Sequence, residues 1–175
     1  ELLKQRLDQE KLNRVYEVFE KPLVKILSQI EMNGIKVDNA YLKKLSKKFG
    51  DKIKKIEKEI YSIANKEFNI GSPKQLGEII YNELKIAKLK KTRKGGLATS
   101  ASVLEDLSFK GHKLPRLVLD WRQLSKLKNT YSDALQEHIN PNTNRVHTSF
   151  LLAATNTGRL ASSDPNLQNI PIKTE

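Results

Sequence analysis

The residues best suited to chemistry lie in one polar stretch, TGRLASSDPNLQNIP at 157–171. Four hydrogen-bonding side chains stand there among Gly, Pro and Ser: Arg159, Asn166, Gln168 and Asn169. Such side chains suit the minor groove of a nucleic-acid duplex, because every Watson–Crick pair presents an N3 or O2 acceptor there. A donor can then test the shape of a pair without identifying its bases. A polar surface loop in which Asn and Asp only form turns explains the same residue types, and their spacing does not decide between the two.

A second group of candidates lies at predicted helix starts and suits binding of phosphate. Ser72 precedes Pro73, and Thr99 and Ser100 precede another apolar stretch. A helix N-terminus offers unpaired N–H groups and a partial positive charge, although capping by a hydroxyl needs no ligand. Nearby cations that could follow a phosphate backbone without reading its sequence are Lys90, Lys91, Arg93, Lys94, Arg122, Lys126 and Lys128.

The sequence contains no recognisable catalytic or metal-binding pattern. Metal-dependent phosphoryl transfer needs carboxylates that converge on two cations, and the acids here are scattered among lysines. His112, His138 and His147 lack ligand spacing and are expected to be surface or core histidines. There is no Walker-type loop and no nucleophile elbow, and Gly95–Gly96 is expected to be a flexible loop tip. The residues therefore predict a binding surface without a metal.

Apolar spacing predicts that the chain begins with two amphipathic helices. The first is indicated by Leu2, Leu3, Leu7, Leu12, Val15 and Phe19. Pro22 is expected to open the second, because proline is tolerated in the first helical turn, and Asn33–Gly34 to end it. A short connector is expected at 35–38, with Asp38 as the N-cap of the next helix.

The helix predicted from 39 to 63 has the most regular pattern in the chain. Its apolar residues recur every three or four positions and require a partner helix: Leu42, Leu45, Phe49, Ile53, Ile56, Ile60 and Ile63. Its opposite face carries Lys43, Lys44, Lys47, Lys48, Lys52, Lys54, Lys55 and Lys58. A solvated face and contact with phosphate explain these lysines equally well.

Shorter helices are predicted downstream. Ser72 is expected to cap one that starts at Pro73, with Gln75 completing a capping box. The basic stretch 85–100 has little periodicity and predicts an exposed loop, after which Thr99 or Ser100 is expected to cap a short helix.

The character of the chain changes beyond the further helix that Pro115 is expected to open. Asn140–Asn144 is rich in turn formers. Arg145–Phe150 predicts one strand, because β-branched and aromatic residues gather there. The rest is expected to be loops, broken by Gly158, Pro165 and Pro171.

Composition limits the classes of protein that fit. The 175 residues include 32 Lys+Arg against 20 Asp+Glu, a net charge of +12, which favours a polyanionic partner such as nucleic acid over a merely soluble basic protein. Absence of Cys excludes disulfides and thiolate metal sites and fits the cytosol. No apolar run approaches the roughly 20 residues that span a membrane, and no signal-peptide core is present. Both ends break off within a pattern, so the chain is expected to be part of a longer protein.

Several motifs together resemble one known family. HTSF at 147–150, followed by TGRLASSDPNLQNIP, closely resembles the start of the palm in family A DNA polymerases, the bacterial DNA polymerase I group. The resemblance covers nearly the whole chain, since it extends to KLKNTY (126–131), VLEDL (103–107), FNIGSPKQL (68–76) and PLVKILSQIEMNGIKVD (22–38). It implies a mainly α fold with long paired thumb helices and a small β-containing piece of the α+β palm. The implied divisions are helices leading into the polymerase domain at 1–36, thumb at 37–140 and the beginning of the palm at 141–175.

The resemblance also implies roles for the candidate residues. Arg159 is similar to the family arginine that contacts the minor groove at the primer terminus. The resemblance places Asn166, Gln168 and Asn169 near the nascent base pair and template. Thumb positions that hold the backbone are matched by Arg122, Lys126 and Lys128, and thumb helix starts close to the duplex by Ser72, Thr99 and Ser100. The chain departs from many relatives at Ala98 and Ala161, where each missing serine removes one possible hydroxyl contact.

The family's catalytic motifs are absent from the printed sequence. Its first catalytic aspartate lies in a DYSQIELR-like motif downstream, and the fingers helix and HDE-like motif lie further on. The resemblance therefore implies a full-length DNA-directed DNA polymerase of bacterial DNA replication and repair, cytoplasmic and nucleoid-associated, that uses Mg²⁺ and deoxynucleotides. This stretch by itself is expected to bind primer–template duplex without polymerising and to hold no cofactor.

Two other classes of protein remain open on the residues alone. A freestanding basic helical nucleic-acid-binding protein explains the charge and the helices, but not the closing motif. A helical interaction domain with a protein partner explains the lysines as a solvated face. The sequence leaves the oligomeric state open.

Overall fold

The computed structural model describes residues 2–88, 92 and 95–170, and these are mainly helical, as expected. Contacts divide the chain into two compact units, the first made of Glu1–Asn39 with Ala134–Glu175 and the second of Ala40–Asp133. The predicted division at 1–36, 37–140 and 141–175 into named subdomains stays a prediction. Outside the described residues lie the loop cations Lys90, Lys91, Arg93 and Lys94, together with Pro171.

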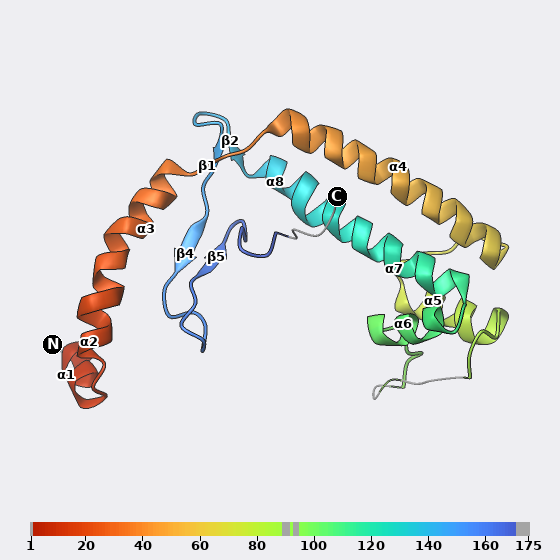
Figure 1. Cartoon of the computed structure of the whole chain (residues 1–175), viewed down its shortest axis with the longest axis horizontal. Coiled ribbons are helices and arrows are strands. Elements are labelled where there is room, and N and C mark those ends of the chain that lie inside the picture. The colour runs from red at the N-terminus through yellow and green to blue at the C-terminus, as the bar shows by residue number, and fades with distance from the viewer. Residues whose placement is uncertain (1, 89–91, 93–94, 171–175) are drawn as a thin grey trace. The chain divides into compact units, whose positions relative to one another are not determined.

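The second unit is built on two long helical segments that run side by side (Figure 1). They are α4 (Asn39–Ala64), and α7 (Lys113–Lys126) with its π-helical continuation η3 (Leu127–Asp133). The shorter elements are α5 (Pro73–Glu78), η2 (Ile79–Glu83) and α6 (Ala101–Phe109). One apolar cluster joins all of them except η3, and its fully buried members are Ile60, Leu76, Ile79, Ile80, Leu104, Leu114 and Val118.

The helix predicted from 39 to 63 is confirmed as α4. Its apolar seam is buried at Phe49 and Ile60, and every lysine of the opposite face is exposed. The seam has the partner helix that the pattern requires, since the Trp121 Nε1–H on α7 donates to Glu57 Oε1 on α4 at 2.9 Å. Amphipathic periodicity alone therefore fixed which face of α4 is covered.

The start of α5 follows the prediction in part. Ser72 is the N-cap, and its Oγ accepts from the Gln75 N–H at 3.4 Å. The expected capping box is wrong, because Gln75 Oε1 accepts instead from the Asn69 N–H at 2.7 Å. The Ser72 N–H that it would have capped already donates to the Asn69 carbonyl at 3.0 Å.

The first unit begins with α1 (Leu2–Gln9), α2 (Asn13–Val15), η1 (Tyr16–Glu20) and α3 (Lys21–Asn33). The single first helix expected here is wrong, because the chain leaves it near Lys11, whose φ is +57°. The helix expected from Pro22 is confirmed, since α3 begins at Lys21 with Pro22 in its first turn and ends at Asn33, although it follows η1 without a break. A proline inside a helix cannot bond to the carbonyl four residues earlier. The wide π turn of η1, in which the Lys21 N–H donates to the Tyr16 carbonyl, lies just ahead of it.

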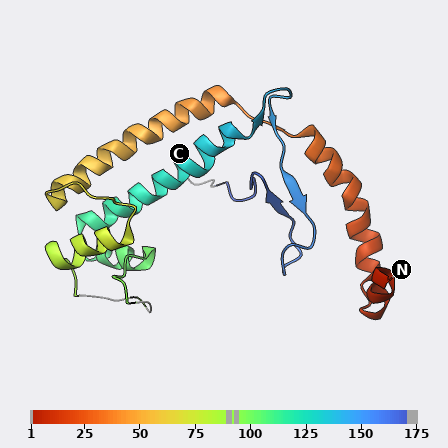
Figure 2. The ribbon, with the colours of Figure 1, turned by 180° about the vertical axis from the view of Figure 1, so that it is seen from behind.

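Two small antiparallel sheets complete the first unit (Figure 2). One has the strand order β1-β3-β2, from β1 (Ile35–Lys36), β2 (Ile139–Asn140) and β3 (Arg145–Val146), and the other pairs β4 (Ser149–Leu151) with β5 (Ala161–Ser163). Within the first sheet, both Ile35 and Ile139 oppose Val146. The connector expected at 35–38 is therefore partly a strand.

The single strand predicted at 145–150 is divided between the two sheets. Its interruption falls at His147 and Thr148, whose side chains bond to other segments. His147 Nδ1 lies 2.7 Å from the Glu31 carbonyl of α3, and the Thr148 hydroxyl donates to the carbonyls of Ser163 and Pro165 at 2.9 and 2.8 Å. Residue types favour a strand here, but these tertiary bonds separate β3 from β4.

Gly77 allows a close approach inside the second unit and generates a test of the packing. A Cβ atom at Gly77 would lie 2.5 Å from Leu97 Cβ, whereas one at Gly50 in α4 would meet only Lys128 Cε at 3.5 Å. Gly77→Ala should lower the free energy of unfolding by about 1–3 kcal/mol, because overpacking outweighs the better helix propensity of alanine. Gly50→Ala should leave it unchanged or raise it by up to about 1 kcal/mol. Urea unfolding measures both, and equal effects would contradict the packing of Leu97 on α5.

Candidate nucleic-acid interface

The loop between β4 and β5 presents Arg159 to solvent. The Thr155 hydroxyl donates to the Arg159 carbonyl at 2.8 Å, and the Gly158 N–H donates to the Thr155 carbonyl at 3.3 Å. Gly158 has φ +71°, which residues with a side chain adopt at a cost. The guanidinium of Arg159 is exposed and makes no hydrogen bond or ion pair with any described residue. A locally bonded backbone therefore carries a cation that is available to a ligand.

Gln168 is brought next to Arg159 by the segment that follows β5. Its Nε2 donates to the Leu160 carbonyl at 2.7 Å, one residue from Arg159. Two further bonds fold this segment back: Ser162 Oγ accepts from the Leu167 N–H at 2.9 Å, and Asn166 Oδ1 accepts from the Gln168 N–H at 3.0 Å. Gln168 thus keeps its amide oxygen and one N–H for a ligand, while Asn166 and Asn169 are exposed beside it.

The three predicted hydroxyl sites of the second unit lie in different environments. Ser72 Oγ is used as a helix cap by Gln75. Thr99 is only 6% exposed, so its side chain does not reach the surface. Ser100 is exposed at the N-cap position of α6, and its Oγ lies 3.1 Å from Ser102 Oγ without making a cap bond. Ser100 is therefore the best placed of the three to meet a phosphate.

Arg122 holds the start of α6 in place. Its NH1 donates to the Thr99 carbonyl at 2.8 Å, and burial lowers the pKa of its guanidinium from the ordinary value. Just before Thr99, the Tyr81 hydroxyl donates to the Ala98 carbonyl at 2.8 Å. These two bonds fix the backbone that carries Ser100. The structure thus places Arg122 under the candidate surface.

Lys126 and Lys128 were predicted to have the same role, but their side chains lie in different environments. Lys126 is exposed. Lys128 is half-buried, forms an ion pair with Asp133, and its Cε approaches Gly50 of α4. Residues five apart do not face each other on an α-helix, but the wider π turn of η3 brings them together. For this reason the spacing in the sequence did not identify Asp133 as the partner of Lys128.

Asp133 belongs to a polar cluster that ties η3 to α4. Desolvation raises the pKa of its carboxyl, but hydrogen bonds from Lys128 and Ser46, the charge of Lys128 and a bond from Ser132 outweigh it, so the pKa is lowered. The Ser132 hydroxyl also donates to the Lys128 carbonyl at 2.9 Å. The cluster therefore favours an ionised Asp133 in the folded state.

The described residues contain neither a metal site nor a membrane span. No group of three or more His, Cys, Asp or Glu side chains among them could hold a metal ion. Of the histidines, His147 lies between the Glu31 carbonyl and the Thr143 hydroxyl, 2.8 Å from the latter, and His112 is the N-cap of α7. Within the described part of the chain, no helix is long and apolar enough to cross a bilayer.

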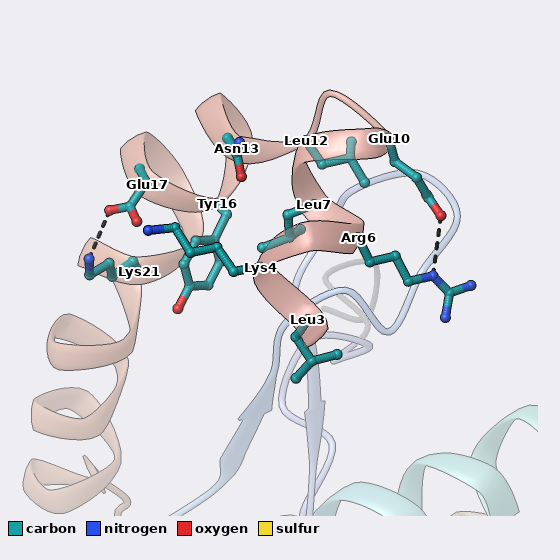
Figure 3. Close-up of a pocket in the computed structure, with 10 residues that line it drawn as sticks. All are labelled: Leu3, Lys4, Arg6, Leu7, Glu10, Leu12, Asn13, Tyr16, Glu17 and Lys21. Atoms are coloured by element: carbon teal, nitrogen blue, oxygen red, sulfur yellow. Dashed lines mark hydrogen bonds and ion pairs between the residues drawn. The ribbon is translucent and has the colours of Figure 1, made fainter. Parts of the chain in front are cut away.

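A cavity of about 700 Å³ lies among the N-terminal helices, away from every predicted site residue (Figure 3). Leu3, Leu7 and Leu12 contribute its apolar lining. Its two carboxylates are held in exposed ion pairs one helical turn apart, Arg6 with Glu10 and Glu17 with Lys21. Each carboxylate thus has a cation as its partner, and the described lining residues include no histidine, cysteine or serine that could act as a base or nucleophile.

Comparison with known proteins identifies the family. The model for DNA polymerase family A matches residues 39–175, and the chain belongs to that family. It is 50% identical over 173 residues to DNA polymerase I of Rhizobium leguminosarum, which covers 99% of this chain and 17% of that protein. It is 45% identical over 175 residues to DNA polymerase I of Bacillus subtilis, covering 100% of this chain and 20% of that protein.

A solved structure with the same fold supports the match. It is the POL domain of Pol1 from M. smegmatis in complex with DNA primer-template and dNTP, at 38% identity and a TM-score of 0.90, and the match covers 99% of this chain and 30% of that one. The chain therefore corresponds to a portion of the polymerase domain of DNA polymerase I and spans about a fifth of the length of its curated relatives. Family membership favours the polymerase interpretation over the two alternatives that the residues left open.

The Asp133 cluster predicts a specific acid sensitivity. The pKa of Asp133 in the folded state lies below its ordinary value of 3.8. The stabilisation that ionised Asp133 provides is therefore complete above pH 3.8 and is lost as pH falls through the folded-state pKa. Asp133→Asn should lower the free energy of unfolding at pH 7 by a few tenths to about 1 kcal/mol and flatten its decrease below about pH 4.

The control for this prediction is Asp120→Asn, at an exposed position of α7. It should change neither quantity measurably. Urea unfolding between pH 2.5 and 7 measures both variants, and an acid limb that is identical in Asp133→Asn and the unchanged chain would contradict the cluster.

Proposed function

We propose that this chain is the duplex-gripping part of a DNA-directed DNA polymerase of the DNA polymerase I type, active in DNA replication and repair. The observation that carries the proposal is the exposed guanidinium of Arg159, which has no partner among the described residues and stands on a backbone bonded at Thr155. Membership of family A and a fold similar to that of a polymerase domain solved with primer-template support it. In this proposal 37–140 is the thumb and 141–175 the beginning of the palm.

Arg159 and Gln168 inspect the primer terminus from the minor groove. N3 and O2 acceptors occur at every base pair there, so two donors side by side can require correct pair geometry without preferring a sequence. The Gln168–Leu160 bond keeps the two side chains on adjacent backbone while leaving one Gln168 N–H for the groove. Asn166 and Asn169 extend the same exposed surface towards the template.

The second unit binds the sugar–phosphate backbone. Lys126 supplies an exposed cation, and Ser100 supplies a hydroxyl at the N-terminus of α6. Arg122 and Thr99 act through position, because their mutual bond holds the start of α6. Lys128 is assigned to the contact between η3 and α4, and Ser72 to capping of α5.

Bond formation belongs to residues outside this stretch. The described residues do not fit a Mg²⁺ site, so no step through the metal is assigned to them. Mg²⁺ and deoxynucleotides are partners of the full-length enzyme, and primer–template is the partner of this stretch. Location in the bacterial cytoplasm, on the nucleoid, stays a prediction that follows from this function.

Arg159→Ala in the full-length protein tests the role of the groove contact. Primer extension should fall about 10- to 100-fold, which corresponds to the roughly 1.5–3 kcal/mol of a hydrogen bond to a charged group. The Kd for primer–template should rise less than about fivefold, because one exposed charge contributes little to binding. Single-turnover extension and fluorescence anisotropy measure the two quantities.

Arg14→Ala is the matched control for Arg159→Ala. Arg14 is exposed on α2, outside the residues that the family model matches. Its replacement should change neither extension nor binding. Unchanged extension in Arg159→Ala would reject the assignment of Arg159 to the primer terminus.

Lys126→Met tests the backbone contact. Removal of one cation from the phosphates should weaken binding equally for duplexes of different sequence and reduce the slope of log K against log salt by about 0.9. Lys25→Met, at an exposed site on α3, should leave the slope unchanged. Titrations between 50 and 200 mM salt measure it, and a sequence-dependent decrease in affinity would count against a phosphate contact.

A further inference from the structure

One strongly charged surface of the second unit plays no part in the function proposed above. It is the outer face of α4, here called the lysine strip, and it consists of Lys43, Lys44, Lys47, Lys48, Lys52, Lys54, Lys55 and Lys58. All eight side chains are exposed, and none forms an ion pair with a described residue. Two acids lie between Lys43 and Lys58: Asp51, which is exposed, and Glu57, which accepts a hydrogen bond from Trp121. The strip therefore carries a dense excess of positive charge.

The packing of α4 leaves the strip on the exposed face of this helix. The opposite face of α4 is held by the buried Phe49 and Ile60 and by the Trp121–Glu57 hydrogen bond. From Lys43 to Lys58 the strip extends over roughly 22 Å at 1.5 Å per residue. Duplex DNA carries one negative charge per roughly 1.7 Å of its axis, so the strip faces enough phosphates to pair with most of its lysines.

We propose that the lysine strip is a second binding surface for the sugar–phosphate backbone of duplex DNA, separate from the Arg159 surface and indifferent to a primer end. The inference goes beyond the proposed function, because it requires neither a recessed end nor the groove contact. Charge complementarity over this length increases the rate of encounter with DNA and retains the protein on it after the primer end is released.

The composition of the strip selects duplex DNA over other polyanions. Surfaces that bind single strands stack bases on aromatic side chains, and the exposed residues of α4 between Lys43 and Lys58 include none. Helices that lie on membranes insert an apolar face, and the apolar face of α4 is buried at Phe49 and Ile60. A helix face of closely spaced lysines fits a regular array of phosphates.

The test uses the full-length protein with four strip lysines neutralised around Asp51: Lys47→Gln, Lys48→Gln, Lys54→Gln and Lys55→Gln. The control variant makes the same change of net charge at exposed lysines elsewhere: Lys4→Gln, Lys25→Gln, Lys36→Gln and Lys110→Gln. The ligand is a blunt duplex without a recessed end, and binding is titrated from 50 to 200 mM salt. Circular dichroism checks that α4 keeps its helicity, which glutamine supports.

The strip variant should reduce the slope of log K against log salt by about three to four, at roughly 0.9 for each phosphate that is no longer neutralised, and the control by less than about one. The proposal would be overturned if the slope decreased equally in the two variants, or if it did not change in the strip variant. A strip variant that keeps the duplex slope but no longer binds single-stranded DNA or anionic lipid vesicles would also overturn it. Failure of the proposed function is distinct, because it appears as unchanged primer extension in Arg159→Ala.

Discussion

The second unit depends on the burial of one face of α4 against its own chain. Ile60 from this face belongs to the same apolar cluster as Leu114 and Val118 of α7, and removal of such surfaces from water is the main favourable contribution to folding. Polar interactions lie along the same boundary: Trp121 with Glu57, and Lys128 with Asp133 in η3. Because one face is committed to this core, the opposite face has to be polar, and the lysine strip lies there.

In each unit, a hydrogen bond from a polar side chain to a backbone carbonyl holds a candidate DNA-binding segment. Arg122 uses the Thr99 carbonyl to hold the start of α6, and Gln168 uses the Leu160 carbonyl to hold the segment after β5. In each case the bonded side chain lies beside an exposed one, Ser100 or Arg159. A residue that matches a DNA contact of the family by position can thus act by holding the backbone of its neighbour. Arg122 is such a residue, whereas Lys126 is exposed and free to meet DNA itself.

Much of the local structure was accessible from the sequence where a single segment decides its own conformation. The period of α4, the end of α3 at Gly34 and the cap at Ser72 all follow from residue types within a few positions. The predictions failed where distant segments compete for the same groups. His147 and Thr148 divide a predicted strand because their partners are Glu31 and Ser163.

The sequence by itself determined the family motif, the positive charge, the mainly helical class and the candidate residues around Arg159, because each depends on residue identity and short-range spacing. Only the tertiary structure decided which candidates reach solvent. Thr99 is buried and Lys128 is paired with Asp133, whereas Arg159 and Lys126 are exposed. The physical reason is that exposure depends on which segments pack together. Local spacing in the sequence does not reveal a π turn that brings residues five apart together. It also does not reveal a hydrogen bond to a backbone carbonyl of a distant helix.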